Sequence, residues 1–182
     1  MSDYKIGIAI PSTGTIKSQT VFSLCRMLKD FPYEYTVLFH EGSMLHVMRN
    51  RLVQKAIDEK CTHLLFIDSD MVFEKDSAIR LLKRNKDIIG VNYHKRKLPL
   101  EATVQNPKKL QGLTTCDAVG TGFMLIKLDV FKKLEQPWFF WAYADGEPVG
   151  EDFYFCAKVR EKGYNVWCDF SIKVLHIGNF LY

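Results

Sequence analysis

The first half of the chain alternates short apolar runs with segments whose apolar residues recur at helical spacing. Apolar runs typical of strands occupy residues 5–11, 35–39, 63–67 and 87–93. Segments with apolar side chains three and four positions apart, the period of an amphipathic helix, lie between them at residues 18–28, 48–57 and 76–82. Strands that alternate with helices predict a mostly parallel central sheet with helices on both faces, an α/β fold.

Residues 63–67 (HLLFI) form the most informative of these runs. They are almost all apolar, which predicts a strand buried on both faces, because a half-exposed strand would alternate apolar and polar residues. Asp68-Ser69-Asp70 follows directly, at the sheet edge where open α/β folds bind ligands. Two close carboxylates repel each other, so we expect a cation beside them. The triplet is also typical of a plain strand-to-turn boundary, since Asp and Ser are common turn residues.

The second half of the chain has a mixed pattern. Its expected elements are, in order, an irregular polar stretch at 98–113, a strand at 114–126 interrupted by Gly120-Thr121-Gly122, a short helix at 129–134, an aromatic cluster at 138–143, a helix opened by Gly150-Glu151-Asp152 and ended by Gly163, and short strands at 164–168 and 173–175 that lead to His176. We expect a single domain over residues 1–182, with a nucleotide-binding half at 1–97 and an acceptor or catalytic half at 98–182.

Composition narrows the class of protein. The 182 residues, 47% hydrophobic and 25% charged, suit one ordinary globular domain. No apolar run approaches the ~20 residues that span a bilayer, and the N-terminus lacks the pattern of a signal peptide. Five scattered cysteines without a Cys-x-x-Cys pair favour reduced thiols and a cytoplasmic location. The net charge of +4 suits an anionic ligand without requiring nucleic acid.

Polar groups that could carry chemistry lie where strands end or helices begin: Asp68 with Asp70, His176, Glu151 with Asp152, and Arg49 with Arg51. Arginines in the opening turn of a helix, together with its free N–H groups, can hold a phosphate. Two carboxylates and one imidazole suit Mn²⁺ or Mg²⁺, and the histidine favours Mn²⁺. Such a metal would bind a diphosphate and stabilise the charge that develops as it leaves.

On these residues the chain resembles a glycosyltransferase of the GT-A fold, the class that uses nucleotide-sugar donors and an Asp-x-Asp metal motif. The resemblance runs through most of the chain and rests on six segments in the family's order: residues 6–13, Arg49-Asn50, Asp68-Ser69-Asp70, Gly120-Thr121-Gly122-Phe123-Met124, Gly150-Glu151-Asp152 and His176. It implies one Rossmann-like GT-A domain.

The resemblance also implies roles for these residues. Asp70 would bind the metal directly, Asp68 would reach it through water or contact the ribose, and His176 would be the third protein ligand. Asp152 would take the proton from the acceptor hydroxyl, and Glu151 would orient Asp152 or bind the acceptor. A carboxylate at a helix N-terminus is expected to keep a low pKa, which makes Asp152 a modest base.

Substrate contacts follow from the same resemblance. The residues expected at the nucleotide and donor are Pro11, Ser12, Thr13, Arg49, Asp68, Ser69, Tyr93 and Lys95. The residues expected at the sugar and acceptor are Gly120, Thr121, Gly122 and Trp141. UDP is the favoured donor nucleotide and GDP its rival, and the Glu151-Asp152 pair favours inversion. The acceptor stays open among a glycan, a protein, a lipid-linked sugar and a nucleic-acid base.

Simpler structural interpretations also stay open. His176 could be a partly buried core histidine, Glu151 and Asp152 could be first-turn acids that stabilise a helix, and Arg49 could be solvated. The aromatic cluster at 138–143 could be a buried patch or a platform for a sugar ring.

Other functions and a mobile segment remain as alternatives. The basic run at 94–97 is typical of a solvated loop, and Gly146 with Pro148 favours a flexible loop that could close over the donor. A sugar-nucleotide nucleotidyltransferase is the alternative enzyme, although residues 11–17 hold only one glycine where that class has a glycine-rich phosphate loop. A nucleotide- or nucleic-acid-binding module, using the basic runs 83–86 and 94–97, is the non-enzymatic alternative.

Overall fold

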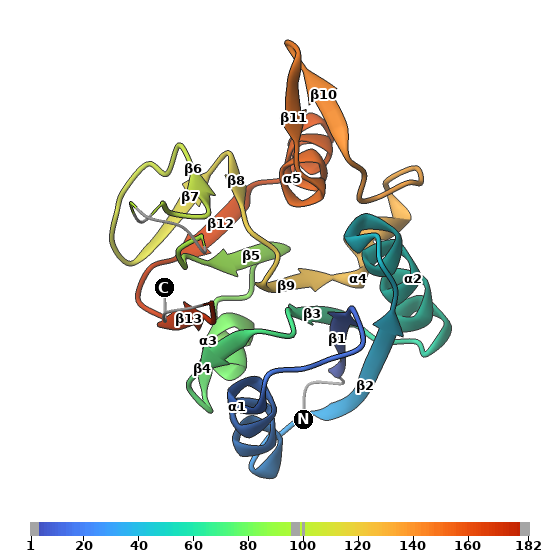
Figure 1. The fold of residues 1–182 in the computed structure, drawn as a ribbon, viewed down its shortest axis with the longest axis vertical. Coiled ribbons are helices and arrows are strands. Elements are labelled where there is room, and N and C mark those ends of the chain that lie inside the picture. The colour runs from blue at the N-terminus through green and yellow to red at the C-terminus, as the bar shows by residue number, and fades with distance from the viewer. Residues whose placement is uncertain (1–3, 96–98, 100, 179–182) are drawn as a thin grey trace.

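A seven-stranded sheet forms the centre of the computed structural model, which describes residues 4–95, 99 and 101–178 (Figure 1). The strand order is β2-β1-β3-β9-β5-β12-β7. The strands are β1 (Lys5–Ser12), β2 (Glu34–Glu41), β3 (His63–Ile67), β5 (Ile88–Val91), β7 (Leu113–Cys116), β9 (Phe123–Lys127) and β12 (Val166–Asp169). Parallel pairing joins β1 to β2 and β3, and β5 to β12, whereas β9 and β7 run antiparallel to their neighbours. The predicted mostly parallel sheet is confirmed.

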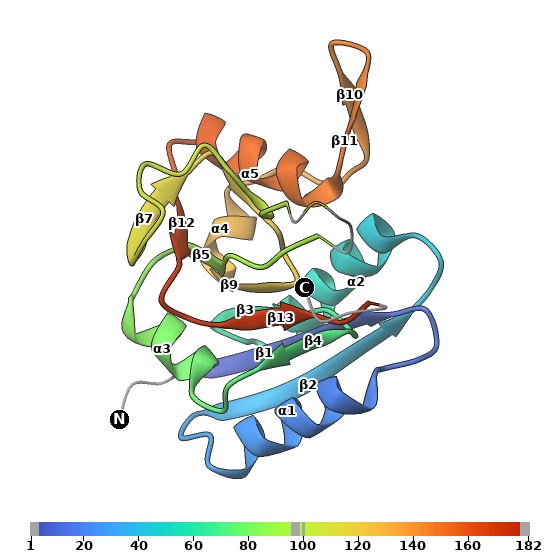
Figure 2. The same cartoon turned by 60° about the vertical axis from the view of Figure 1, so that its left-hand side comes forward.

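Helices cover both faces of this sheet, as Figure 2 shows. They are α1 (Ser18–Lys29), α2 (Leu45–Asp58), α3 (Ser77–Lys83), α4 (Leu128–Lys132) and α5 (Glu151–Glu161). Strand β3 supplies both cores, because its successive side chains point to opposite faces. Leu65 and Ile67 pack with α1 and α3, and Leu64 and Phe66 pack with α2, α4 and α5. All four side chains are fully buried, so the apolar run was correctly predicted as a doubly buried strand.

Short antiparallel pairs complete the fold: β4 (Met71–Phe73) with β13 (Val174–His176), β6 (Val104–Gln105) with β8 (Ala118–Val119), and β10 (Ala142–Ala144) with β11 (Glu147–Val149). The first pair matters most for chemistry. It sets His176 opposite Met71, and the N–H of Ile177 donates to the carbonyl oxygen of Asp70 at 2.8 Å. This ladder brings the end of the described chain to the end of β3.

The interrupted strand predicted at 114–126 is wrong in detail. The segment forms β7, β8 and β9, which belong to two different sheets, and Gly120-Thr121-Gly122 separates the last two. The glycines allow a close approach rather than a bend within one strand. A Cβ on Gly122 would collide with the Tyr93 hydroxyl and the Met71 methyl, while the N–H of Gly122 donates to Tyr93 Oη at 2.8 Å.

Two other local predictions were wrong. The loop expected around Gly146 is the β10–β11 hairpin, whose turn residues Asp145 and Gly146 have φ values of 53° and 81°. This hairpin projects from the body of the molecule beyond α5 (Figures 1 and 2). On α1, Val21 lies exposed while Thr20 and Ser23 face the core, so apolar spacing misplaced the buried face. Within the described residues, no helix is long and apolar enough to cross a membrane.

Candidate functional site

A cavity of about 620 Å³ opens at the carboxyl ends of β1, β3 and β5. Most of the residues predicted from the sequence to bind donor or metal or to act in catalysis line it: Pro11, Ser12, Thr13, Arg49, Asp68, Ser69, Asp70, Tyr93, Lys95, Trp141, Glu151, Asp152 and His176. They come from elements that are distant in the sequence. The fold therefore brings the predicted donor, metal and catalytic residues to one place, which we call the catalytic cavity.

The loop after β1 forms one wall of this cavity and is held by its own hydrogen bonds. The hydroxyl of Ser12 donates to the carbonyl of Thr15 at 3.0 Å and accepts the N–H of Gly14 at 3.1 Å. Gly14 adopts a φ of 108°, which an L side chain rarely adopts. The backbone of this turn is thereby closed on itself, and Thr13 stays exposed at its tip.

Arg49 is the centre of a buried charge network. Its side chain is 1% exposed and packs over the Phe66 ring at 5.3 Å. Nε donates to Oε1 of Glu151 at 3.1 Å, and Nη2 donates to the two carboxylate oxygens of Asp68 at 3.0 and 3.3 Å. Burial alone would lower the pKa of Arg49, but the carboxylates of Asp68, Glu151 and Asp152 raise it above its ordinary value. The guanidinium is therefore charged and joins β3 to α5.

Two expectations about the arginines need correction. Helix α2 begins at Leu45, so Arg49 lies in its second turn and not among the free N–H groups of the opening turn. Arg49 is not solvated, and its Nε and Nη2 face Glu151 and Asp68 rather than the N–H groups of the opening turn. Arg51 is exposed and lines a neighbouring cavity instead.

Asp152 has a raised pKa, contrary to the low value expected at a helix N-terminus. Burial is the largest cause, followed by the negative charge of Glu151, and together they outweigh Arg49 and the N–H of Phe153, so the pKa rises to about 6. That N–H donates to Oδ1 at 2.8 Å. The helix terminus does stabilise the carboxylate, but its effect is smaller than the cost of taking the charge out of water. Asp152 is consequently a stronger base than a solvated carboxylate.

Asp70 and His176 form a second pair in the same cavity. Nε2 of His176 lies 3.3 Å from Oδ1 of Asp70, and Nδ1 lies 3.2 Å from the carbonyl oxygen of His94. A carbonyl can only accept, so Nδ1 carries a proton, and in the neutral ring Nε2 presents its lone pair to the carboxylate. Such a contact is favourable only when a proton or a cation lies between the two atoms.

The pair fits a metal site, whereas the predicted three-ligand group is not found. Ligands of an octahedral Mg²⁺ or Mn²⁺ lie roughly 3 Å apart, close to the separation of Nε2 and Oδ1, and a backbone partner on the other ring nitrogen is typical of ligating histidines. Among the residues that the structure describes, no three His, Cys, Asp or Glu side chains converge as a ready-made metal cluster. Asp68 is turned toward Arg49 instead.

Gly120, Thr121 and Gly122 are buried behind the cavity wall and do not line it. Their position seats Tyr93, which does line the cavity and whose ring stands edge-on to His176 at 5.6 Å. Burial, and next to it the charges of Asp68 and Asp152, raises the pKa of Tyr93 well above its ordinary value, so the phenol stays neutral. Residues 120–122 therefore affect the shape of the cavity indirectly, by fixing the position of Tyr93.

At the rim, Lys95 pairs with Glu101 at 3.1 Å, and Trp141 is 52% exposed. Arg96 and Lys97, the rest of the predicted basic run, lie outside the described residues. The aromatic cluster is buried only in part. Trp138 and Phe139 are buried, while the side chains of the following residues are exposed.

Ser43, Leu45 and Met48 also line the cavity, although the sequence analysis did not single them out. They lie at the start of α2, and this helix begins at Leu45, three residues before the predicted boundary at 48. Met44 and Leu45, at this helix terminus, are apolar, and no side chain caps the first turn, so the usual start signals are missing.

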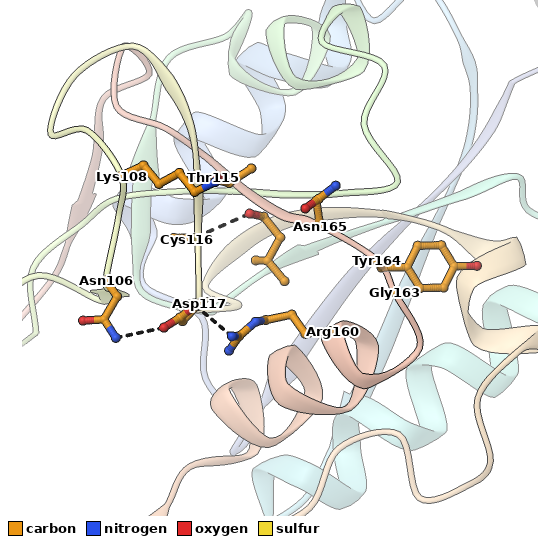
Figure 3. Close-up of a pocket in the computed structure, with 10 residues that line it drawn as sticks. Asn106, Lys108, Thr115, Cys116, Asp117, Arg160, Gly163, Tyr164 and Asn165 are labelled. Atoms are coloured by element: carbon orange, nitrogen blue, oxygen red, sulfur yellow. Dashed lines mark hydrogen bonds and ion pairs between the residues drawn. The ribbon is translucent and has the colours of Figure 1, made fainter.

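A separate cavity of about 300 Å³ lies near the other end of α5 (Figure 3). Asp117 joins its two sides, because it accepts from Asn106 Nδ2 at 2.8 Å and pairs with Arg160 Nη2 at 2.9 Å. The charge of Arg160 is thus neutralised. None of the residues predicted for donor, metal or catalysis lines this cavity.

Known structures share this architecture at low sequence identity. Protein A197 from STIV matches with a TM-score of 0.72 and 22% identity, over 96% of this chain and 86% of its own. UDP-glucose pyrophosphorylase, in complex with UDP-glucose, matches with a TM-score of 0.55 and 8% identity, over 93% and 92%. The inositol-1-phosphate CTP transferase from T. maritima matches with a TM-score of 0.52 and 12% identity, over 97% and 90%.

These similarities show the fold alone, a mostly parallel α/β sheet with helices on both faces that this chain shares with the three structures. No protein-family model matches the chain. No curated protein sequence matches it either.

Replacing Arg49 with methionine should destabilise the protein strongly. The substitution leaves the Asp68 and Glu151 carboxylates without their counter-charge, and breaking a buried pair in this way costs about 3–5 kcal/mol. Urea denaturation would measure the loss. Arg51→Met is the control, because Arg51 lies two residues further along the same helix and is exposed. This variant should change stability by less than about 0.5 kcal/mol. Similar losses in both variants would show that the network does not stabilise the fold.

Asp152 should make stability decline as pH rises from 4 to 6. Its pKa is about 6 in the folded chain against an ordinary 3.8, so the folded state binds more protons than the unfolded state in this interval. Unfolding free energy therefore falls with rising pH there. Asp152→Asn cannot ionise and should gain stability relative to the parent at pH 7 but not at pH 4. Urea denaturation across this range would measure it, and parallel profiles would contradict the raised pKa.

Proposed function

We propose that this protein is a metal-dependent glycosyltransferase of the GT-A type, which moves a sugar from a nucleoside-diphosphate sugar to an acceptor hydroxyl. One observation carries the proposal. The catalytic cavity holds a carboxylate with a pKa near 6, Asp152, together with the Asp70–His176 pair, and Arg49 connects the elements that bear them. A base beside a pair that could hold a divalent cation fits an inverting transfer from such a donor.

The charge of the cavity supports a cation in the donor complex. Among the described lining residues, the acids are Asp68, Asp70, Glu151 and Asp152, and the permanent cations are Arg49 and Lys95. Carboxylates beside a diphosphate are unfavourable, so a cation that accompanies the donor would favour its binding. Asp70 and His176 are the residues that would hold Mn²⁺ or Mg²⁺, and the ion, when bound, would neutralise the diphosphate and the charge of the leaving nucleotide.

Asp152 is the proposed general base. Its pKa near 6 lies close to neutral pH, so it is largely deprotonated at pH 7 yet accepts a proton more readily than a solvated carboxylate. It takes the proton of the acceptor hydroxyl as that oxygen attacks the anomeric carbon, which inverts the configuration there. Glu151 is committed to Arg49 and therefore positions α5, leaving its neighbour for the proton transfer.

The donor side of the cavity would be formed by the loop after β1 and by Ser69, Tyr93 and Asp68. UDP is the first donor nucleotide to test and GDP the second. The role of Asp68 would be to orient the ribose or a metal-bound water while it keeps its contact with Arg49.

A nucleotidyltransferase is the second candidate, because the pyrophosphorylase named above shares the fold. That chemistry needs a loop after the first strand that cradles a triphosphate with several backbone N–H groups. Here the turn after β1 has one glycine, and Ser12 takes up the N–H of Gly14. Release of pyrophosphate from a nucleoside triphosphate and a sugar phosphate would favour this candidate over glycosyl transfer.

Thermal stabilisation by UDP, GDP, CMP and ADP, each with and without Mn²⁺, tests the donor proposal. One nucleotide should raise the melting temperature only when Mn²⁺ is present, with about 2.7 kcal/mol of stabilisation at 100 times its dissociation constant. Asp70→Asn should abolish the shift, and Asp76→Asn, an exposed acid before α3, should retain it. A metal-independent shift, an unaffected Asp70→Asn or no shift with any nucleotide would each count against the proposal.

Asp152→Asn tests the catalytic proposal. The variant should keep the Mn²⁺-dependent nucleotide shift and lose about 10²–10⁴-fold in transfer rate, because only the proton acceptor is removed. Release of the nucleotide product from the sugar donor identified above would measure it. In the parent protein the rate should rise with pH, reach half of its maximum near pH 6 and level at higher pH as Asp152 becomes fully ionised. A variant that transfers at the parent rate would exclude Asp152 as the base.

A further inference from the structure

A third cavity, of about 540 Å³, lies beside the catalytic cavity, on the outer side of the first turns of α2. Its walls are that face of α2, including His46, Arg51 and Gln54, and the segment 136–140. We call it the aromatic groove. Its volume falls within the roughly 300–1,000 Å³ of small-ligand sites. The two cavities share the α2 terminus, since Leu45 and Met48 face one and His46 and Val47 face the other.

The segment at residues 138–141 separates the two cavities and is fixed by Asn50. The amide of Asn50 accepts the N–H groups of Trp138 and Phe139 at 2.9 and 3.2 Å, and it donates to the carbonyl oxygen of Phe139 at 2.7 Å. Trp138 and Phe139 are thereby turned into the core, at 5% and 0% exposure. The next two rings, Phe140 and Trp141, are turned outward.

These two exposed rings face different cavities. Phe140, 45% exposed, lines the aromatic groove, and Trp141, 52% exposed, lines the catalytic cavity. Phe140 stands edge-on to His46 at 5.8 Å and to Tyr154 at 5.9 Å. The ring is therefore held between two neighbours while almost half of its surface stays open. A fixed and exposed aromatic face is a preorganised contact surface.

The chemistry of the groove differs from that of the catalytic cavity. Among its described lining residues there is no Asp or Glu, whereas the catalytic cavity has four carboxylates. Arg51, Gln54 and Gln136 are exposed and can hydrogen-bond to hydroxyl groups around the Phe140 ring. An aromatic face surrounded by amide and guanidinium groups matches a pyranose ring, which has apolar C–H faces and hydroxyl groups around its edge.

We propose that the aromatic groove binds the penultimate sugar of an oligosaccharide acceptor, with the terminal sugar placed between Trp141 and Asp152 in the catalytic cavity. This inference rests on the proposed glycosyl transfer and specifies its acceptor as a saccharide chain of at least two units. The neighbouring position of the two cavities supports it, because the adjacent residues Phe140 and Trp141 each place a ring at one of them and can contact successive sugars of a chain that crosses this segment. Phe140 is then a specificity residue that selects oligosaccharides over monosaccharides.

Binding of saccharides without any nucleotide tests the inference. The full chain would first be applied to a glycan array of mono- and oligosaccharides, and then titrated by NMR with a retained disaccharide and with its terminal monosaccharide. The parent protein should retain glycans that share one terminal disaccharide and should bind the disaccharide more tightly than the monosaccharide. Phe140→Ala should weaken disaccharide binding about tenfold, as loss of one aromatic contact predicts, and leave monosaccharide binding within about twofold.

Phe22→Ala is the matched control, since Phe22 is 64% exposed on α1, on the opposite face of the sheet from α2. It should bind both saccharides within about twofold of the parent protein. The inference is overturned if no glycan is retained, or if Phe140→Ala binds the disaccharide as the parent does. It is also overturned if the parent is a dimer that Phe140→Ala converts to a monomer, because the groove would then be a contact between two copies.

Failure of this inference and failure of the proposed function would look different. Mn²⁺-dependent nucleotide binding without any retained saccharide would remove the acceptor assignment and leave the transferase proposal standing. Phe140-dependent saccharide binding by a protein that binds no nucleotide would leave a saccharide-binding groove and remove the transfer reaction.

Discussion

The burial of Arg49 between Asp68 and Glu151 is the interaction on which the rest of the candidate site depends. A charged guanidinium in the interior is tolerated only when carboxylates surround it, and those carboxylates come from the end of β3 and the start of α5. Asp68 and Glu151 are 19 and 102 residues away from Arg49 along the chain, respectively. The ion pairs therefore set how α2, β3 and α5 meet, and with them the shape of the catalytic cavity.

The same network divides the acids of the cavity into two kinds. Asp68 and Glu151 are held by Arg49. Burial and the negative charge of Glu151 raise the pKa of Asp152 more than the Arg49 guanidinium lowers it, so this pKa rises to about 6. Adjacent acids at one helix start thus acquire different properties, one structural and one suited to proton transfer. Separation of roles between neighbouring carboxylates is a recurrent property of catalytic sites.

The β4–β13 ladder contributes the other half of the site. Strand β4 continues directly from Asp70, and its antiparallel pairing with β13 places His176 within reach of that carboxylate. The carbonyl of His94, beyond β5, then decides which ring nitrogen faces Asp70. Asn50 likewise holds the backbone before Phe140 and Trp141. Hydrogen bonds to the backbone therefore orient both the His176 ring and these two aromatic residues.

Much of the architecture could be derived from the sequence, because it depends on local periodicity. Alternating apolar runs and amphipathic segments predicted the mostly parallel sheet, and the apolar run of β3 predicted burial on both faces and an acidic edge. The residues predicted for donor, metal and catalysis mostly line one cavity, since strand ends and helix starts converge at that edge. The short β4 and the β10–β11 hairpin were missed, because these three-residue strands depend on their pairing partners rather than on a periodic pattern.

Only the tertiary structure determined the partners of each charged group. Sequence spacing placed Arg49 and Asp152 at helix starts, but whether a charge is solvated, paired or destabilised by burial depends on segments far away in the chain. Arg49 became the centre of an ion-pair network, Asp152 gained a raised pKa, and Asp68 pairs with Arg49. The sequence by itself determined which elements form and which edge carries the polar residues. Long-range packing determined the electrostatics, because Coulomb and desolvation energies depend on distance and burial in three dimensions.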